Sequence, residues 1–177
     1  VQRVEFDGTE TDEALIVSLL SCRNVEGIEL GYGSEAITDG DVRMLGELRA
    51  LKDLDFGSVE ITDATLIALS RRRLLEKVSI HSYEVNDAGI SALATCPLTE
   101  LDVLAISVAD DGMAAVSKCT TLERISVFGT EMTDRGLASI VRLPKLHSLW
   151  LDDVKIDGSG FAFVGEESQL SNVTLSD

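Results

Sequence analysis

A short motif of alternating apolar and polar residues returns eight times along the chain, as in LKDLDF and LEKVSI. Its copies begin at Val1, Val25, Leu51, Leu75, Leu98, Leu122, Leu146 and Leu170. Successive copies start 24, 26, 24, 23, 24, 24 and 24 residues apart. A nearly fixed period in the twenties is typical of proteins that stack one strand and one helix per unit. We therefore predict a single repeat domain over residues 1–177, with about seven full units and a final strand.

The unit from Leu75 to Pro97 shows how each copy is expected to fold. Val78 and Ile80 alternate with polar neighbours, which predicts a short strand with these two side chains facing inward. Asn86 stands where a helix needs a cap that accepts hydrogen bonds from its first turn, and Asp87 favours the helix start electrostatically. Apolar residues then recur every third position along one helix face, at Ile90, Leu93 and Cys96.

The predicted cap position holds a hydrogen-bond acceptor in six of seven units. Its residues are Asp12, Thr38, Thr62, Asn86, Ala109, Thr133 and Asp157. Ala109 is the exception, and we expect the neighbouring Asp110 to replace it as the cap. Two apolar columns follow, which predicts that Phe161 and Val164 face inward in the seventh unit. The 26-residue unit carries two extra residues around Tyr32–Glu35.

A glycine often precedes the first of these apolar columns, at Gly89, Gly112, Gly136 and Gly160. A residue without a side chain at this place predicts close packing of the helix turn against a neighbour.

The segments that open the helices carry a more specific signature, namely ITDATL at Ile61–Leu66, VNDAGI at Val85–Ile90 and MTDRGL at Met132–Leu137. Together with the Leu-x-x-Leu-x-Leu strand motif and a Cys that closes the helix, they make the chain resemble the cysteine-containing subtype of the leucine-rich repeat family. The resemblance implies a curved α/β solenoid with a parallel sheet on its concave side, helices on its convex side, and binding more often than catalysis. Similar units occur in the substrate-recognition part of F-box proteins and in many bacterial repeat proteins. Because no F-box-like helical segment precedes the repeats in this sequence, we do not expect a ubiquitin-ligase role.

Net charge narrows the class of partner. The 177 residues include 15 basic and 31 acidic ones, which gives a net charge of −16. Such a field repels phosphate backbones and anionic lipids, so we expect neither nucleic acid nor a membrane surface as partner. A protein partner with a basic segment fits the field, although acidity that only keeps the solenoid soluble is an equal alternative. No signal-peptide or membrane-span pattern is present. The chain begins and ends on a predicted strand, so a missing upstream segment stays open.

Three cysteines share one column at the helix ends, Cys22, Cys96 and Cys119. Other units place Leu48 and Leu143 there, so we predict buried thiols that act as small hydrophobic residues. The gap between Cys96 and Cys119 offers no metal-ligand spacing, and no metal or cofactor is expected. A disulfide between these two neighbours is the alternative, whereas the odd cysteine count favours a reducing, cytoplasmic compartment.

The outward strand residues form the candidate binding face. Its middle column reads Glu5, Glu29, Asp55, Ser79, Asp102, Ser126, Trp150 and Thr174. Four of its first five members are acids, which repel one another at strand spacing and attract a basic partner. Later units instead place Leu104, Phe128 and Trp150 close together, flanked by His81, His147 and Arg124. Such aromatic and Arg anchors inside a polar rim are typical of protein interfaces. The alternative is packing against further repeats or a capping segment.

Candidate chemistry is sparse. Ser79, His81 and Asp102 are the nearest approach to a nucleophilic triad, and any folded chain offers such a set. The segment Asp152–Gly158 lacks the ligand order of a calcium loop, and no glycine-rich phosphate loop with a Lys is present. We therefore predict a non-catalytic protein-interaction module rather than an enzyme. The alternative function is a structural or assembly element that pairs through uncapped solenoid ends, and the oligomeric state stays open.

Overall fold

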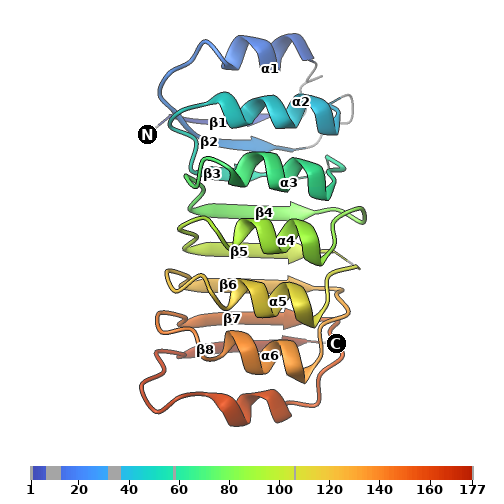
Figure 1. Ribbon diagram of the computed structural model, residues 1–177, viewed down its shortest axis with the longest axis vertical. Helices are drawn as coiled ribbons and strands as arrows, with labels where there is room; N and C mark the ends of the chain where they lie inside the picture. Colours follow the sequence, from blue (N-terminus) through green and yellow to red (C-terminus); the bar gives the residue numbers. More distant parts are fainter. Residues whose placement is uncertain (1, 7–12, 32–36, 58, 106, 177) are drawn as a thin grey trace.

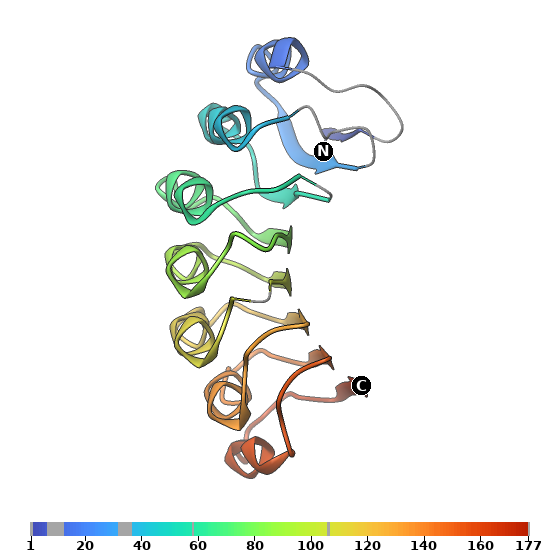
Figure 2. The same cartoon turned by 90° about the vertical axis from the view of Figure 1, so that its right-hand side faces the viewer.

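The computed structural model describes residues 2–6, 13–31, 37–57, 59–105 and 107–176. Its eight strands form one sheet in chain order, and each strand pairs in parallel with the next (Figure 1). Figure 2 shows two layers that curve together, with the strands on the concave side and the helices on the convex side. The predicted curved α/β solenoid is confirmed. Val1, the expected cap Asp12 and the insertion around Tyr32–Glu35 lie outside the described residues.

Each unit supplies one strand and, except for the last, one helical segment. The strands are β1 Gln2–Phe6, β2 Val25–Leu30, β3 Asp53–Asp55, β4 Lys77–His81, β5 Glu100–Leu104, β6 Arg124–Phe128, β7 Ser148–Asp152 and β8 Asn172–Ser176. The α-helices are α1 Glu13–Leu19, α2 Asp39–Met44, α3 Asp63–Ser70, α4 Asp87–Leu93, α5 Asp110–Val116 and α6 Asp134–Ile140. Two 3-10 helices, η1 Leu45–Glu47 and η2 Ser159–Phe163, complete the convex layer.

The core is one continuous apolar layer to which every central unit contributes the same wedge. In the fifth unit, Leu101 and Val103 of β5 are fully buried, as are Met113 and Val116 of α5. Exposure alternates along β5 because successive strand residues point to opposite faces of the sheet. The apolar residues are therefore used in packing, and the intervening residues line the concave face.

A column of five aspartates at the helix starts joins each unit to the next. These helix-start aspartates are Asp39, Asp63, Asp87, Asp110 and Asp134. The Oδ1 atom of Asp110 accepts hydrogen bonds from the backbone N–H groups of Thr133 at 2.8 Å and Gly136 at 2.9 Å. Its Oδ2 atom accepts from the Thr133 hydroxyl at 2.7 Å. Asp110 thus pairs donors at the start of α6 that have no partner within that helix.

This arrangement corrects two predicted caps. The N–H of Ala109 donates to Asp87 of the preceding unit at 2.8 Å, so the prediction that Asp110 replaces Ala109 as cap is wrong. The prediction that Thr62 accepts a hydrogen bond from its own helix is also wrong. Its hydroxyl instead donates to Asp39 at 2.9 Å. In both units the carboxylate of the previous helix binds the residue at the cap position instead.

The same carboxylates explain three of the four recurring glycines. A Cβ atom on Gly89 or Gly112 would stand 2.5 Å from the Oδ1 atom of the helix-start aspartate one unit earlier, and one on Gly136 would stand 2.7 Å away. At the fourth, Gly160, a Cβ atom would instead meet the backbone carbonyl of Asp134 at 2.7 Å and the Leu137 side chain at 2.8 Å. Real Cβ atoms essentially never come that close. The predicted close packing at these glycines is confirmed, and at the first three its neighbour is a carboxylate.

The first unit departs from the prediction at its cysteine. Cys96 and Cys119 are buried, and each thiol donates to a carbonyl of the preceding unit, Cys96 to Ser70 at 3.7 Å and Cys119 to Cys96 at 3.2 Å. Cys22 is exposed, so its predicted burial is wrong. No earlier unit among the described residues covers it. All three thiols are free.

The seventh unit departs from the prediction at its helix. The single 3-10 segment η2 ends at Phe163, so Val164 falls outside it and is 37% exposed. Its predicted inward position is wrong, and Phe161 is only half-buried. Val173 and Leu175 of β8 are also exposed, because no later unit in the described residues packs against them.

Candidate functional site

The concave face brings the predicted middle column into register. Parallel pairing places Asp55 beside Ser79, Ser79 beside Asp102, and Ser126 beside Trp150. Glu5 and Glu29 are likewise neighbours on β1 and β2. The middle column therefore forms one row across the sheet, with acids at one end and Trp150 near the other.

Three apolar side chains form the apolar patch, Leu104, Phe128 and Trp150. Leu104 and Phe128 are register partners on β5 and β6. The rings of Phe128 and Trp150 meet edge to face, with centroids 5.2 Å apart and planes at 67°. Trp150 is 47% exposed, and Phe128 is half-buried. His81 on β4 is the register partner of Leu104 and borders the patch.

The first acids of the middle column are neutralised by Arg3 in the neighbouring outward column. The guanidinium of Arg3 contacts Glu29 at 2.7 Å and Glu5 at 3.2 Å. The expected repulsion between Glu5 and Glu29 is thus offset by a cation between them. The sequence signal was available, because Arg3 lies two residues before Glu5 and so shares its face of the strand.

A second ion cluster stands in the same outward column as Arg3. Glu100 lies between Lys77, at 2.5 Å, and Arg124, with which it also forms an ion pair. Burial disfavours the charged form of Glu100, but hydrogen bonds from Lys77 and Arg124 outweigh it and lower the pKa of this carboxyl. These two cations are committed to Glu100.

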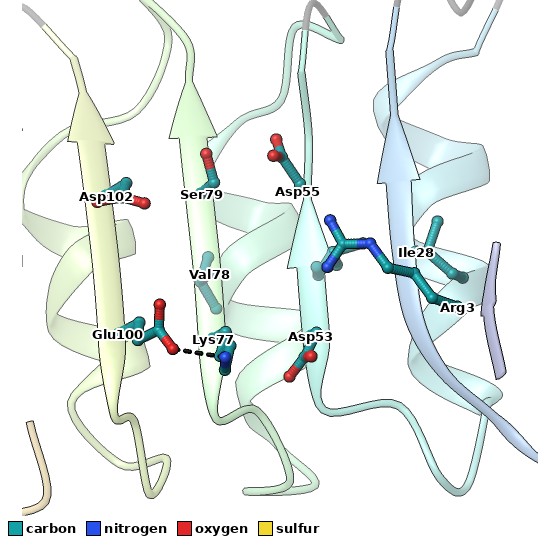
Figure 3. Close-up of a pocket in the computed structure, with 10 residues that line it drawn as sticks. Arg3, Ile28, Asp53, Asp55, Lys77, Val78, Ser79, Glu100 and Asp102 are labelled. Carbon is teal, nitrogen blue, oxygen red and sulfur yellow. Dashed lines mark ion pairs between the residues drawn. The ribbon is translucent and has the colours of Figure 1, made fainter. Parts of the chain in front are cut away.

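The remaining acids surround a shallow hollow of about 180 Å³ between β3 and β5, shown in Figure 3. We call it the acidic hollow, because four acids outnumber two cations in its lining. Its charged and polar residues are Asp53, Asp55, Glu100, Asp102, Arg3, Lys77 and Ser79. Burial raises the pKa of Asp53, an effect that neighbouring Lys77 only partly opposes. The carboxylates of Asp53 and Asp102 form no ion pair or hydrogen bond within the described part of the chain. Ser79, with its short side chain, separates Asp55 from Asp102.

The arrangement offers no assembled catalytic or metal site among the described residues. Ser79, His81 and Asp102 lie on neighbouring strands, but no hydrogen bond joins their side chains. In the described ranges, no group of three His, Cys, Asp or Glu residues is placed to hold a metal ion. Burial raises the pKa of the Cys96 thiol, which disfavours the reactive thiolate. What the concave face presents is the acidic hollow and, beside it, the exposed apolar patch.

None of the helices in the described ranges is long and apolar enough to cross a membrane.

Comparison with known protein families finds no match, and comparison with characterised protein sequences finds none either. Comparison of structures does find similar folds. Internalin C2 from Listeria monocytogenes superposes with a TM-score of 0.65 at 22% identity, over 89% of this chain and 64% of that one. TLR13, in its complex with ssRNA13, superposes with a TM-score of 0.62 at 17% identity, over 94% of this chain and 27% of that one.

The chain therefore spans less than two thirds of the length of either structure, and these identities speak for the fold alone. Both are leucine-rich-repeat proteins. The cysteine-containing subtype stays a prediction from the sequence motifs. The fold of this protein is that of the leucine-rich repeat.

Proposed function

We propose that this protein is a non-catalytic interaction module that binds a protein partner on its concave face. The observation that carries the proposal is the exposed apolar patch. In it the rings of Trp150 and Phe128 pack edge to face on an otherwise polar sheet face. A folded protein gains nothing in its own stability from leaving half of a Trp in water. Aromatic residues in such a setting are enriched at interface hot spots.

Charge supports a basic partner. With a net charge of −16, the chain attracts cationic segments over distances of about 8–10 Å at ordinary ionic strength. The acids proposed to steer the partner are Glu5, Glu29, Asp55 and Asp102, of which Asp55 and Asp102 form no ion pair within the described residues. The fold itself does not exclude nucleic acid, because TLR13 has it and occurs in complex with RNA. A protein is therefore proposed in preference to nucleic acid or a membrane surface on the negative charge alone.

A pull-down followed by titration of the purified partner tests the proposal. The variant Trp150→Ala/Phe128→Ala removes the apolar patch, and we expect it to weaken binding at least a hundredfold, as loss of a central hot spot does. The matched control is Val17→Ala/Ile67→Ala, which removes two exposed apolar side chains from α1 and α3 on the convex side. Circular dichroism should show both variants folded. Wild-type affinity in the Trp150/Phe128 variant would contradict the proposal.

A second candidate function is assembly through the solenoid end. The five residues of β8 are uncharged and all exposed, with Val173 at 42% and Leu175 at 55%. An uncharged strand at the edge of a sheet is a template for pairing with another chain. Light scattering across a concentration series tests this candidate, and a monomer mass at every concentration would refute it.

The compartment proposed from the sequence, a reducing cytoplasmic one, is supported by three free thiols of which two are buried. Quantifying thiols in protein purified under non-reducing conditions checks it. Three reactive thiols per denatured chain are expected, and one would contradict it.

A further inference from the structure

We propose that the acidic hollow receives one Arg or Lys side chain of the partner, in an extended segment that crosses the strands and places an apolar side chain on the apolar patch. This inference rests on the proposed function and specifies the chemistry of the partner. It rests on two observations: some concave acids form ion pairs while others in the described residues do not, and the acids without ion pairs lie near the rings of Phe128 and Trp150.

The concave acids differ in whether a cation already serves them. Arg3 is shared by Glu5 and Glu29, and Glu100 has two cations of its own. Within the described residues, the carboxylates of the hollow that form no ion pair are Asp55 and Asp102, which lie on either side of Ser79, and Asp53, whose charge Lys77 and Arg3 offset only in part. An incoming cation therefore gains most by entering at Ser79, where the short side chain leaves space between two carboxylates (Figure 3).

The raised pKa of Asp53 points in the same direction. Its carboxylate is partly withdrawn from water and its pKa is also raised by Glu76 and Glu100, while Lys77 and Arg3 offset this only in part. A cation seated in the hollow supplies the missing counter-charge to this group as well. The hollow is thus complementary to one positive side chain.

Strand spacing sets the distance between the two contact points. Ser79 and Trp150 are three strands apart in register, through Asp102 and Ser126. With parallel strands roughly 4.8 Å apart, this separation is about 14 Å. An extended segment rises about 3.4 Å per residue, so four residues span the distance. Residues i and i+4 of an extended segment also point to the same side, so both side chains reach the sheet.

The prediction for the partner is therefore a cationic residue and an apolar residue four positions apart. The test is a display selection of random 12-residue peptides against three proteins, followed by titration of the selected peptides at low and high salt. The proteins are the wild type, Asp55→Asn/Asp102→Asn and the control Glu84→Gln/Glu166→Gln. The control removes the same two charges at exposed positions outside the hollow. The side-chain amide oxygen that Asp55→Asn introduces can still accept the hydrogen bond from the Gly57 N–H, so the turn after β3 is retained.

Peptides selected on the wild type and on the control should be enriched in Arg or Lys four positions from an apolar residue. On the hollow variant that cation preference should disappear while the apolar preference remains. A wild-type-selected peptide should bind the hollow variant about tenfold more weakly, as loss of two half-exposed ion pairs predicts, and added salt should weaken only its wild-type binding. A second variant, Ser79→Arg, places a tethered guanidinium in the hollow and should block the same peptides.

Two results would separate the inference from the proposed function. Peptides that require Trp150 and Phe128 but show no cation preference would overturn the inference and leave the interaction face in place. Selection that yields only peptides indifferent to Trp150 and Phe128 would overturn the proposed function and the inference with it. Unchanged binding to Ser79→Arg also contradicts an occupied hollow.

Discussion

The helix-start aspartates and the acids of the acidic hollow are all carboxylates, but they differ in whether they bind the neighbouring unit. Asp110 on the convex side gives both oxygens to the backbone and hydroxyl of the next unit. Asp102 on the concave side has a strand neighbour on each side, yet its carboxylate forms no hydrogen bond or ion pair within the described residues. A recurring acid has a structural role when it accepts hydrogen bonds from the backbone of the adjacent unit. A recurring acid whose carboxylate has no such bond is available to a partner.

The largest effect that this comparison predicts is at the glycine under a helix-start aspartate. In Gly136→Ala the new Cβ meets Asp110 Oδ1 and Met132 Cγ at 2.7 Å, and we expect a loss of about 2–3 kcal/mol of unfolding free energy. The control Gly40→Ala also lies in a first helical turn, but its Cβ meets nothing closer than 3.5 Å. There alanine should be neutral or stabilising by about 0.5 kcal/mol. Urea unfolding measures both, and equal losses would argue against the carboxylate contact.

Next in size is removal of the two kinds of carboxylate. Asp110→Ala leaves the N–H groups of Thr133 and Gly136 without their acceptor, and we expect a loss of about 2 kcal/mol. Asp102→Ala should change stability by less than about 0.5 kcal/mol, because no interaction within the described residues is lost. Urea unfolding of both variants is the measurement. A larger loss for Asp102→Ala than for Asp110→Ala would invert the comparison.

A double variant sharpens this result. In Asp110→Ala/Gly136→Ala the oxygen that clashes with the new Cβ is absent, so the combined loss should fall below the sum of the single losses. Strict additivity would mean that the glycine is required for another reason.

Acid should weaken the contacts that the helix-start aspartates make in the convex layer. Hydrogen bonds from the backbone of Asp157 and Gly160 hold the pKa of Asp134 below its ordinary value. Burial opposes ionisation of Asp39, but bonds from Thr65 and Thr62 outweigh it and lower the pKa of that carboxyl too. A group whose pKa is lower in the folded protein stabilises it above the unfolded pKa, near 4, and loses that contribution as pH falls through the folded value.

Unfolding free energy measured in urea should therefore be level from about pH 7 to 5 and fall below about pH 4. The variant Asp134→Asn should be less stable at neutral pH and show a smaller further fall in acid. An equally steep fall in that variant would show that the drop comes from other groups.

The smallest expected effect is at Asp53. Its pKa is raised by burial, so its ionised form at neutral pH costs stability that is recovered as pH falls through the folded pKa. Asp53→Asn should stabilise the free protein by roughly a few tenths of a kcal/mol. Glu84→Gln, at an exposed position in the loop before α4, is the control for loss of one charge and should be neutral. Destabilisation by Asp53→Asn at neutral pH would contradict a strained carboxylate.

Much of the fold was predictable because the same pattern of apolar and polar residues recurs in every unit. The inward pair Leu101 and Val103 and the helix face around Met113 follow from periods of two and about three residues, and both are fully buried. The meeting of Phe128 with Trp150 also followed, since a fixed period brings equivalent columns of adjacent units together. These predictions needed only local geometry and the repeat interval.

What the sequence could not supply were interactions between units that local geometry does not specify. The convention of a cap residue acting on its own helix assigned Asp110 to α5, whereas its oxygens face α6. The pairing of Arg3 with both Glu5 and Glu29 depends on side-chain reach across strands. The exposure of Cys22 and Val164 depends on having a neighbour on only one side. In each case the deciding contact lies one unit away.

Each helix-start aspartate binds the unit that follows it, so the junctions between units are equivalent and the units are interchangeable. Asp63 binds the N–H groups 23 and 26 residues later, and Asp110 and Asp134 do the same. A unit duplicated or removed as a whole carries one acceptor and one set of donors with it, so the new junction is the same as the old. Lengthening such a chain by gene duplication therefore requires no new interface, and the concave columns are left free to diverge.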